Sequence, residues 1–333
     1  MDLAQAREAA ETFRADAERL RAAIESHVVG LGQTLEACLW CLLADGHLLL
    51  EGVPGLGKTL LVRTIASATG LQAARVQCTP DLMPADILGT PVLVQDPVTG
   101  RRVRRFRPGP VFCQVLLVDE INRAAPRSQS ALLEAMQERS VSVDGDTMQL
   151  ARPFLVLATQ NPIEQEGTYP LPEAQLDRFL AKVIVPVPDR SAMAEILRRT
   201  TAAALPPVPR VIDAAGLLRL QALATMVAVA PHVMDWAVRL VLASQPDGPQ
   251  AWPQTRRWIR VGAGPRGAQA LLRLAKVRAL LAGRHAVAID DLRVVAPCAL
   301  RHRLRLTFEA GADRVDAEAV IAHLLGHLPL EGS

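Results

Sequence analysis

The chain has 333 residues, which at about 150 residues per domain corresponds to two domains. Half of the residues are hydrophobic and 21% are charged, a balance that excludes a disordered chain, and the 3% of aromatic residues predicts a core built from Ala, Leu and Val. The net charge of +3 is too close to neutral to indicate nucleic acid or a membrane surface as a binding partner.

The N-terminal sequence and the cysteines bear on the compartment. The first twenty residues carry acidic side chains and no apolar run, so they do not form a signal peptide. The longest uncharged stretch, 220–234, contains Gln221 and His232 and is too short and polar to span a membrane. Five cysteines, an odd number, argue against a disulfide framework. We therefore expect a cytoplasmic protein.

The first half of the chain alternates short apolar runs with helical patterns, which is typical of strand–helix–strand units and a parallel sheet. The first 25 residues form an amphipathic pattern, and a helix is expected at 58–69, ended by Gly70. Strands are expected at 47–51, 74–78, 113–118, 153–159 and 182–185.

The second half has a different composition. Prolines cluster between 186 and 209, and beyond them apolar residues recur at helical spacing. Helices are expected at 214–226, 231–244, 266–282, 290–299 and 316–328. The sequence thus predicts an α/β domain followed by a helical domain.

The strongest motif is GVPGLGKT at 52–59, which fits G-x-x-x-x-G-K-[ST] between an apolar strand and a helix. Glycines let backbone N–H groups turn inward around phosphates, Lys58 reaches the β- and γ-phosphates, and the Thr59 hydroxyl ligates Mg²⁺. The helix N-terminus adds the positive end of its dipole. The alternative is a glycine-rich turn that binds nothing. The expected nucleotide-binding residues here are Gly52, Pro54, Gly55, Leu56, Gly57, Lys58, Thr59 and Leu60.

A second motif, VLLVDE at 115–120, places two carboxylates at the end of a buried strand. Ligands of open α/β sheets bind at this end of the strands. Asp119 is expected to hold Mg²⁺, through water, and Glu120 to orient and deprotonate an attacking water. The alternative is a pair of solvated carboxylates at a strand end.

A third apolar run, at 154–162, also ends in polar residues. Asn161 is the candidate for touching the γ-phosphate or the water, ahead of Thr159 and Gln160. The alternative is a turn, since an Asn before a Pro is often a turn residue.

These segments, with 119–141, 158–180, FRPGPVF at 106–112 and GAGPRG at 262–267, resemble the MoxR family of AAA+ ATPases. The resemblance implies a five-stranded AAA+ P-loop core followed by a small all-helical lid. The core is expected at 1–188, with a helix-2 insert at about 81–110 and a pre-sensor hairpin at about 140–151. A linker at 189–210 and the lid at 211–333 follow.

The resemblance also assigns roles at matching positions. Residues 52–59 correspond to Walker A, Asp119 and Glu120 to Walker B, and Asn161 to sensor 1. Arg178 corresponds to the arginine finger, acting on the neighbouring subunit; its alternative is a structural ion pair with Asp177 or Glu173. Arg266 corresponds to sensor 2, acting on its own nucleotide, although Gly264 stands where the family more often has Ser. For Arg123 and Arg127, a subunit contact and a plain surface position both stay open.

The function that the resemblance implies is ATP hydrolysis with Mg²⁺ by a ring-forming motor, expected to be a hexamer. A chaperone-like role follows, in metal insertion or complex assembly, with a von Willebrand factor A-domain protein as partner. Two other functions are open: a nucleic-acid translocase, opposed by the near-neutral charge and few aromatic residues, and a nucleotide-gated scaffold, opposed by the complete set of catalytic residues.

Two further features have simpler explanations. Cys38 and Cys41 form a C-x-x-C pattern, which suggests a redox pair or half a zinc site, but they lie in an apolar helical run and are expected to be inert buried thiols. The basic run of Arg101, Arg102, Arg104, Arg105 and Arg107 follows the predicted turn 96–100. It is either a solvated face or a grip for nucleic acid or an acidic partner.

Overall fold

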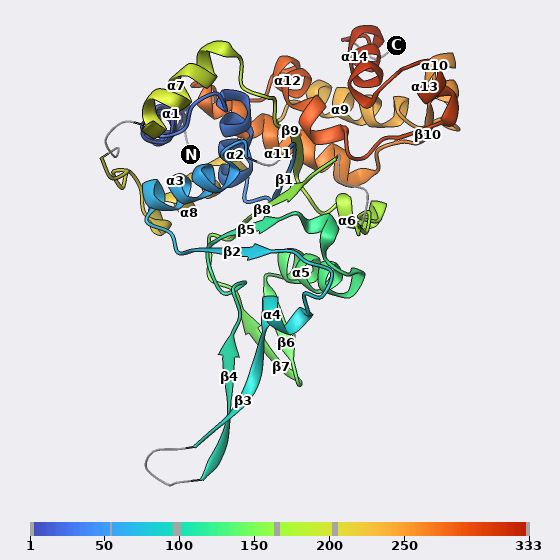
Figure 1. Ribbon diagram of the computed structural model, residues 1–333. Coiled ribbons are helices and arrows are strands. Elements are labelled where there is room, and N and C mark those ends of the chain that lie inside the picture. Colours follow the sequence, from blue (N-terminus) through green and yellow to red (C-terminus); the bar gives the residue numbers. More distant parts are fainter. Residues whose placement is uncertain (1–2, 54, 96–100, 163–166, 202–205, 331–333) are drawn as a thin grey trace.

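This computed structural model describes residues 3–53, 55–95, 101–162, 167–201 and 206–330. A five-stranded parallel sheet in the order β2–β5–β8–β1–β9 lies at its centre (Figure 1). The strands are β1 (Leu48–Glu51), β2 (Ala73–Gln77), β5 (Val115–Asp119), β8 (Leu155–Gln160) and β9 (Ala181–Ile184). All five predicted strands are confirmed, with ends shifted by at most two residues; four of them bury at least half of their residues, whereas β2, at one side of the sheet, buries only Val76. Pro54 and the predicted turn at 96–100 lie outside the described residues.

The parallel strands give the sheet two chemically different edges. The carboxyl edge, where the strands end, carries Glu51 and Asp119. The amino edge, where the strands begin, lies next to Asp45, Arg152 and Arg178, which precede β1, β8 and β9. Side chains at the two edges are therefore separated by the length of the strands.

Helices cover both faces of the sheet. In β1, Leu48 and Leu50 pack into one apolar cluster and Leu49 into the other, as alternation along a strand requires. One face packs against α5 (Pro126–Glu138). The other packs against the N-terminal and lid helices, and Figure 1 shows these two layers on opposite sides of the sheet. The N-terminal helices are α1 (Leu3–Glu25), α2 (Gly32–Leu43) and α3 (Lys58–Thr69).

The second half of the chain is helical, as predicted. The five expected helices are present, with ends within one residue of the prediction or identical to it. They are α8 (Ala214–Met226), α9 (Pro231–Ala243), α11 (Pro265–Leu281), α12 (Ile289–Leu300) and α14 (Ala317–His327). Four short elements were not expected from the sequence: α10 (Pro253–Trp258), β10 (Ile259–Val261), β11 (Arg305–Leu306) and α13 (Phe308–Ala312).

The apolar core is continuous between the predicted core domain and the lid. Helix α1 contacts α2 and α3 and also the lid helices α8 and α11. Phe13 and Leu20 of α1 belong to the same buried cluster as Leu271 and Leu274 of α11. The N-terminal helix therefore joins the two parts rather than belonging to one of them.

The predicted linker at 189–210 contains a helix, α7 (Arg190–Thr201). It has no buried side chain, so the usual periodic burial signal is weak. Asp189 precedes it, and its carboxylate accepts a hydrogen bond of 2.7 Å from the Ala192 N–H. This N-terminal cap is a sequence signal that could have revealed the helix.

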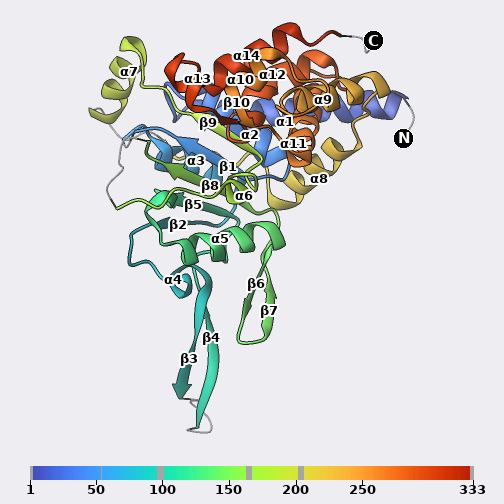
Figure 2. The same cartoon turned by 90° about the vertical axis from the view of Figure 1, so that its right-hand side faces the viewer.

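Two β-hairpins project from the face opposite the lid (Figure 2). The first follows α4 (Pro84–Leu88) and consists of β3 (Gly89–Gln95) and β4 (Arg102–Pro108), within the predicted helix-2 insert. The second consists of β6 (Ser140–Val143) and β7 (Asp146–Gln149), within the predicted pre-sensor hairpin. An ion pair between Arg104 and Asp144 joins the two hairpins.

All five cysteines are free and buried, which confirms the simpler explanation of the C-x-x-C pattern. Burial raises the pKa of Cys38 and of Cys41 above the ordinary thiol value, so both stay protonated. Within the described ranges, no group of three or more His, Cys, Asp or Glu side chains could hold a metal ion, and no helix is long and apolar enough to cross a membrane.

Candidate functional site

The loop between β1 and α3 has the backbone shape that binds phosphate. Gly55 and Gly57 have φ values of +83° and +78°, in the left-handed region that glycine adopts without strain. Gly57 directly precedes the first residue of α3, so the positive end of the helix dipole points into the loop. The Lys58 ammonium donates a hydrogen bond of 2.8 Å to the Gly52 carbonyl, which places a cation inside the loop. Burial lowers the pKa of Lys58, while the nearby carboxylates Asp119 and Glu120 raise it.

Thr159 connects the carboxylate of Asp119, the last residue of β5, to the backbone of Glu120. Its hydroxyl donates to Asp119 Oδ1 at 3.2 Å and accepts from the Glu120 N–H at 2.8 Å. Glu120 has a φ of +56°, a left-handed conformation that costs a non-glycine residue about 1–3 kcal/mol. The hydrogen bond from β8 therefore holds Glu120 in a backbone conformation that it would not adopt by itself.

Strand β2 supplies two polar partners that the sequence analysis missed. Arg75 donates to Asp119 Oδ2 at 2.7 Å, and Gln77 donates to Glu120 Oε2 at 3.3 Å. Arg123 donates to the same Glu120 oxygen at 3.2 Å. Arg75 and Gln77 stand two residues apart, so they lie on one face of β2 just before its carboxyl end. This alternation is the sequence signal from which their place at the site could have been predicted.

These side chains surround one cavity of about 180 Å³ at the carboxyl edge. It is smaller than the ~300–1,000 Å³ of typical ligand pockets, so it suits the phosphate end of a nucleotide. Among the predicted residues, Leu56 and Leu60 do not line it, and Leu60 is exposed. The lining residues are Gly52, Gly55, Gly57, Lys58, Thr59, Arg75, Gln77, Asp119, Glu120, Thr159 and Asn161.

The donor set of this cavity fits a magnesium ion bound together with phosphate. Mg²⁺ prefers oxygen ligands and usually takes one or two from the protein, with phosphate and water completing the octahedron. Thr59 offers a hydroxyl and Asp119 a carboxylate in the same cavity. Thr59 and Asp119 would hold the ion.

Comparison with known proteins agrees with this geometry. The family model for the ATPase family associated with various cellular activities (AAA) matches residues 47–181, and that for the AAA lid domain matches residues 255–324. Chaperone MoxR1 of Mycobacterium tuberculosis is 44% identical over 95% of this chain and 83% of its own length. Protein MoxR of Paracoccus denitrificans is 36% identical over 86% of this chain and 87% of its own. The crystal structure of a protein assigned as an ATPase from Cytophaga hutchinsonii superimposes with a TM-score of 0.91 at 36% identity, covering 99% of each chain.

The chain belongs to the MoxR family of AAA+ ATPases. The five-stranded sheet and the helical lid have the fold that the family resemblance implies. Membership of an AAA ATPase family implies nucleotide binding.

The two arginines that the family resemblance assigns to the nucleotide, Arg178 and Arg266, do not lie at this cavity. Arg178 precedes β9 at the amino edge, and its guanidinium donates to the Leu133 carbonyl of α5 at 2.9 Å. Arg266 is the second residue of α11, and its guanidinium lies 3.7 Å from the Asp177 carboxylate. Both line a second cavity, of about 210 Å³, between the core and the lid. The structure thus does not bring Arg266 to the phosphate loop of its own chain.

The carboxylates near Arg178 have other partners. Asp177 binds Arg303 at 2.7 Å, and Glu173 binds Arg305 at 2.8 Å. The ion pairs that served as the structural alternative for Arg178 are therefore absent from the described residues, and its Nε atom is buried without a hydrogen-bond partner there. Arg127 is exposed on α5.

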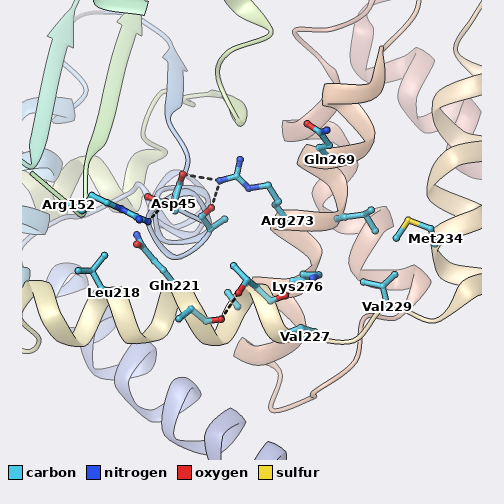
Figure 3. A pocket seen from close by; sticks show the side chains of 15 residues that line it. Asp45, Arg152, Leu218, Gln221, Val227, Val229, Met234, Gln269, Arg273 and Lys276 are labelled. Atoms are coloured by element: carbon cyan, nitrogen blue, oxygen red, sulfur yellow. Dashed lines mark hydrogen bonds and ion pairs between the residues drawn. The ribbon is translucent and has the colours of Figure 1, made fainter. Parts of the chain in front are cut away.

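A larger cavity, of about 850 Å³, lies at the amino edge between α8, α11 and the end of α2 (Figure 3). Its walls are mainly apolar, and three of the basic side chains drawn there bind other groups of the wall. Arg152 pairs with Asp45 at 3.0 Å, and Lys276 donates to the Thr225 carbonyl at 2.8 Å. Arg273 donates to the Asp45 carbonyl at 2.9 Å. None of the predicted site residues that the structure describes lines this cavity.

Proposed function

We propose that this protein hydrolyses ATP to ADP and phosphate at the carboxyl-edge cavity. The observation that carries the proposal is the convergence of Lys58, Asp119, Glu120 and Asn161 on one cavity from three neighbouring strands. These groups support the proposal because phosphoryl transfer needs a cation and backbone donors for phosphate, and carboxylates for metal and water.

The residues of this chain have separate roles in the hydrolysis reaction. Glu120 accepts the proton of the attacking water, and Gln77 and Arg123 fix the carboxylate that does so. Lys58 neutralises negative charge on the phosphates, and Asn161 orients the water or the terminal phosphate. A magnesium ion held by Thr59 and Asp119 would add further neutralisation when bound.

The arginine finger completes the site from a neighbouring subunit. Arg178 lies at the amino edge and the phosphate loop at the carboxyl edge, so Arg178 serves the nucleotide of the next subunit in a head-to-tail ring. The position of Arg266 in the same cavity as Arg178 supports the same assignment for Arg266. The family resemblance supports a hexamer as the closed form of this ring.

The work that the ring performs is chaperone-like remodelling or maturation of a partner protein in the cytoplasm. A relative that is 44% identical bears the name Chaperone MoxR1, which supports the chaperone role. The resemblance to the family further supports metal insertion or complex assembly as the task and a von Willebrand factor A-domain protein as the partner. A Glu120→Gln ring, which binds ATP without turnover, is the bait with which to capture that partner.

The decisive experiment separates ATP binding from ATP hydrolysis. Glu120→Gln keeps the shape of the side chain but cannot accept the proton, so ATP affinity should persist while turnover falls at least ~100-fold, the usual scale for a general base. Lys58→Ala removes the cation from the phosphate loop and should weaken ATP binding itself. Binding is measured with a fluorescent ATP analogue and turnover by phosphate release. Equal turnover in the Glu120→Gln variant and the parent protein would refute the mechanism.

A further inference from the structure

The basic run lies almost entirely on one strand of a hairpin that stands away from the body of the protein (Figure 2). Arg102, Arg104, Arg105 and Arg107 of β4 are all exposed. The described residues of this hairpin, 89–95 and 101–108, include no acidic side chain. Like charges at this spacing repel one another, so β4 carries a concentrated positive potential.

One of these guanidiniums already binds a carboxylate. Arg104 forms an ion pair with Asp144, in the turn between β6 and β7. Among the described residues, no carboxylate lies within ion-pair distance of Arg102, Arg105 or Arg107. The hairpin thus has three arginines available for a ligand that carries negative charge.

The arginines are distributed over both faces of the hairpin. Side chains alternate along a strand, so Arg102 and Arg104 lie on one face and Arg105 and Arg107 on the other. A ligand that lies flat on one face would meet only half of them. A polypeptide strand added beside β4 presents side chains to both faces and can meet Arg102 on one face and Arg105 and Arg107 on the other.

The sheet has room for such a strand. Strands β3 and β4 form a sheet of two strands, so β4 has a strand neighbour on one side only. The hydrogen-bonding groups of its other side are available for β-strand addition. A second copy of the same hairpin would bring arginines against arginines, which disfavours self-pairing.

Single-stranded nucleic acid fits this surface poorly. Proteins that bind it without sequence preference stack bases on exposed aromatic side chains. Phe106 is the one aromatic residue in 89–95 and 101–108, and its ring packs against Phe112 at a centroid distance of 5.6 Å. The surface offers charge and a strand edge but no stacking platform.

We propose that β4 binds an extended acidic segment of a client protein as a third strand, with acidic side chains pairing with arginines on both faces. The proposal deepens the proposed chaperone function, because it names the kind of client segment that the motor would engage. It does not depend on hydrolysis, so binding is tested separately from turnover.

The test uses the full-length Glu120→Gln protein and synthetic twelve-residue peptides followed by fluorescence anisotropy. The probe (Glu-Glu-Ser)₄ can form a strand, whereas (Glu-Glu-Pro)₄ carries the same charge but lacks the backbone N–H groups of a strand at every third residue. We expect the serine peptide to bind at least ~10-fold more tightly than the proline peptide, and its affinity to fall with added salt. Equal affinity for the two peptides would refute strand addition.

Two variants locate the binding surface. Replacing Arg102, Arg104, Arg105 and Arg107 together by Gln should weaken binding of the serine peptide by about tenfold or more, the order expected for losing several exposed ion pairs. The matched control replaces Arg14, Arg19, Arg21 and Arg198, which are also exposed, by Gln and removes the same charge elsewhere. Equal loss in both variants would show attraction to net charge alone and overturn the proposal.

A charge-reversal variant distinguishes the loss of the arginines from misfolding of the hairpin as the cause of weaker binding. Arg105→Glu combined with Arg107→Glu should lose the acidic peptide and gain (Lys-Lys-Ser)₄, a gain that an unfolded hairpin would not produce. Tighter binding of a twelve-nucleotide thymidine strand than of the serine peptide, lost in the four-Gln variant, would replace the proposed client segment by nucleic acid.

Discussion

At the scale of single residues, Thr159 orients both Asp119 and Glu120 through one hydroxyl group. The sequence placed Asp119 and Glu120 correctly at a strand end, because two acidic residues after four buried apolar ones leave little choice. It did not reveal the left-handed backbone of Glu120, which depends on a hydroxyl of another strand. Such a contact between distant residues has no periodic signature, and Arg75 and Gln77 escaped prediction for the same reason.

Replacing Thr159 tests this role directly. Thr159→Val keeps the shape of the side chain but removes both hydrogen bonds, so Glu120 loses the partner that fixes its backbone. We expect turnover to fall about tenfold or more, in proportion to a lost hydrogen bond of about 1.5–3 kcal/mol, with ATP affinity little changed. Thr159→Ser, which retains the hydroxyl, is the matched control and should keep most of the activity. A Val variant as active as the Ser variant would contradict this role.

At the scale of elements, the accuracy of the sequence analysis followed the degree of burial. Strands β1, β5, β8 and β9 and the long lid helices were predicted within one or two residues because each contributes a continuous or periodic set of buried side chains. Helix α7 was missed because it buries none, and α10, β10, β11 and α13 were missed because two to six residues are too few to show a period. The amphipathic pattern of α1 indicates that one face is buried but not which element covers that face, so the packing of α1 against the lid could not be predicted.

His47 joins three elements through one imidazole ring. It precedes β1, its Nε2 donates to the Met136 carbonyl of α5 at 3.0 Å, and its Nδ1 accepts from the Val156 N–H of β8 at 3.0 Å. A proton on Nδ1 would replace this acceptor by a second N–H group and so remove the hydrogen bond from Val156. Burial, which is the largest cause, lowers the pKa of His47 to about 4, well below the ordinary value of 6.5.

This predicts a loss of stability in mild acid. As the pH falls from about 6.5 to about 4, the unfolded chain takes up a proton at His47 and the folded chain does not, so the free energy of unfolding decreases by up to about 3 kcal/mol. His47→Gln can make both hydrogen bonds without titrating, so its stability should decline less steeply over the same range. Urea denaturation at several pH values measures the difference. Parallel pH profiles for the two proteins would show that His47 does not cause the loss.

At the scale of the whole molecule, the two edges of the sheet carry the residues that the proposed ring would bring together. The phosphate loop and Glu120 lie at one edge and Arg178 at the other, so an active site assembled from both needs two subunits. We expect Arg178→Ala and Glu120→Gln proteins to be inactive alone. Mixed together, they should regain part of the ATPase activity at those interfaces where one subunit supplies Glu120 and the next supplies Arg178.

Phosphate release at several mixing ratios, with light scattering to follow assembly in ATP, measures this recovery. A mixture of Arg178→Ala with Lys58→Ala serves as a second pair that should also recover, whereas Glu120→Gln with Lys58→Ala should not, because both residues lie on the same side of the interface. Specific activity of the parent protein that is independent of protein concentration, together with a monomer in ATP, would exclude a shared site.

The lid is attached to the segment that carries Arg178. Arg303 of the lid, with a side chain only 3% exposed, binds Asp177 and the Phe179 carbonyl, the two residues on either side of Arg178. In the proposed ring, a movement of the lid would therefore move the finger of the same subunit, which would serve one neighbour and not the other. Any coupling between successive hydrolysis events would then run in one sense around the ring.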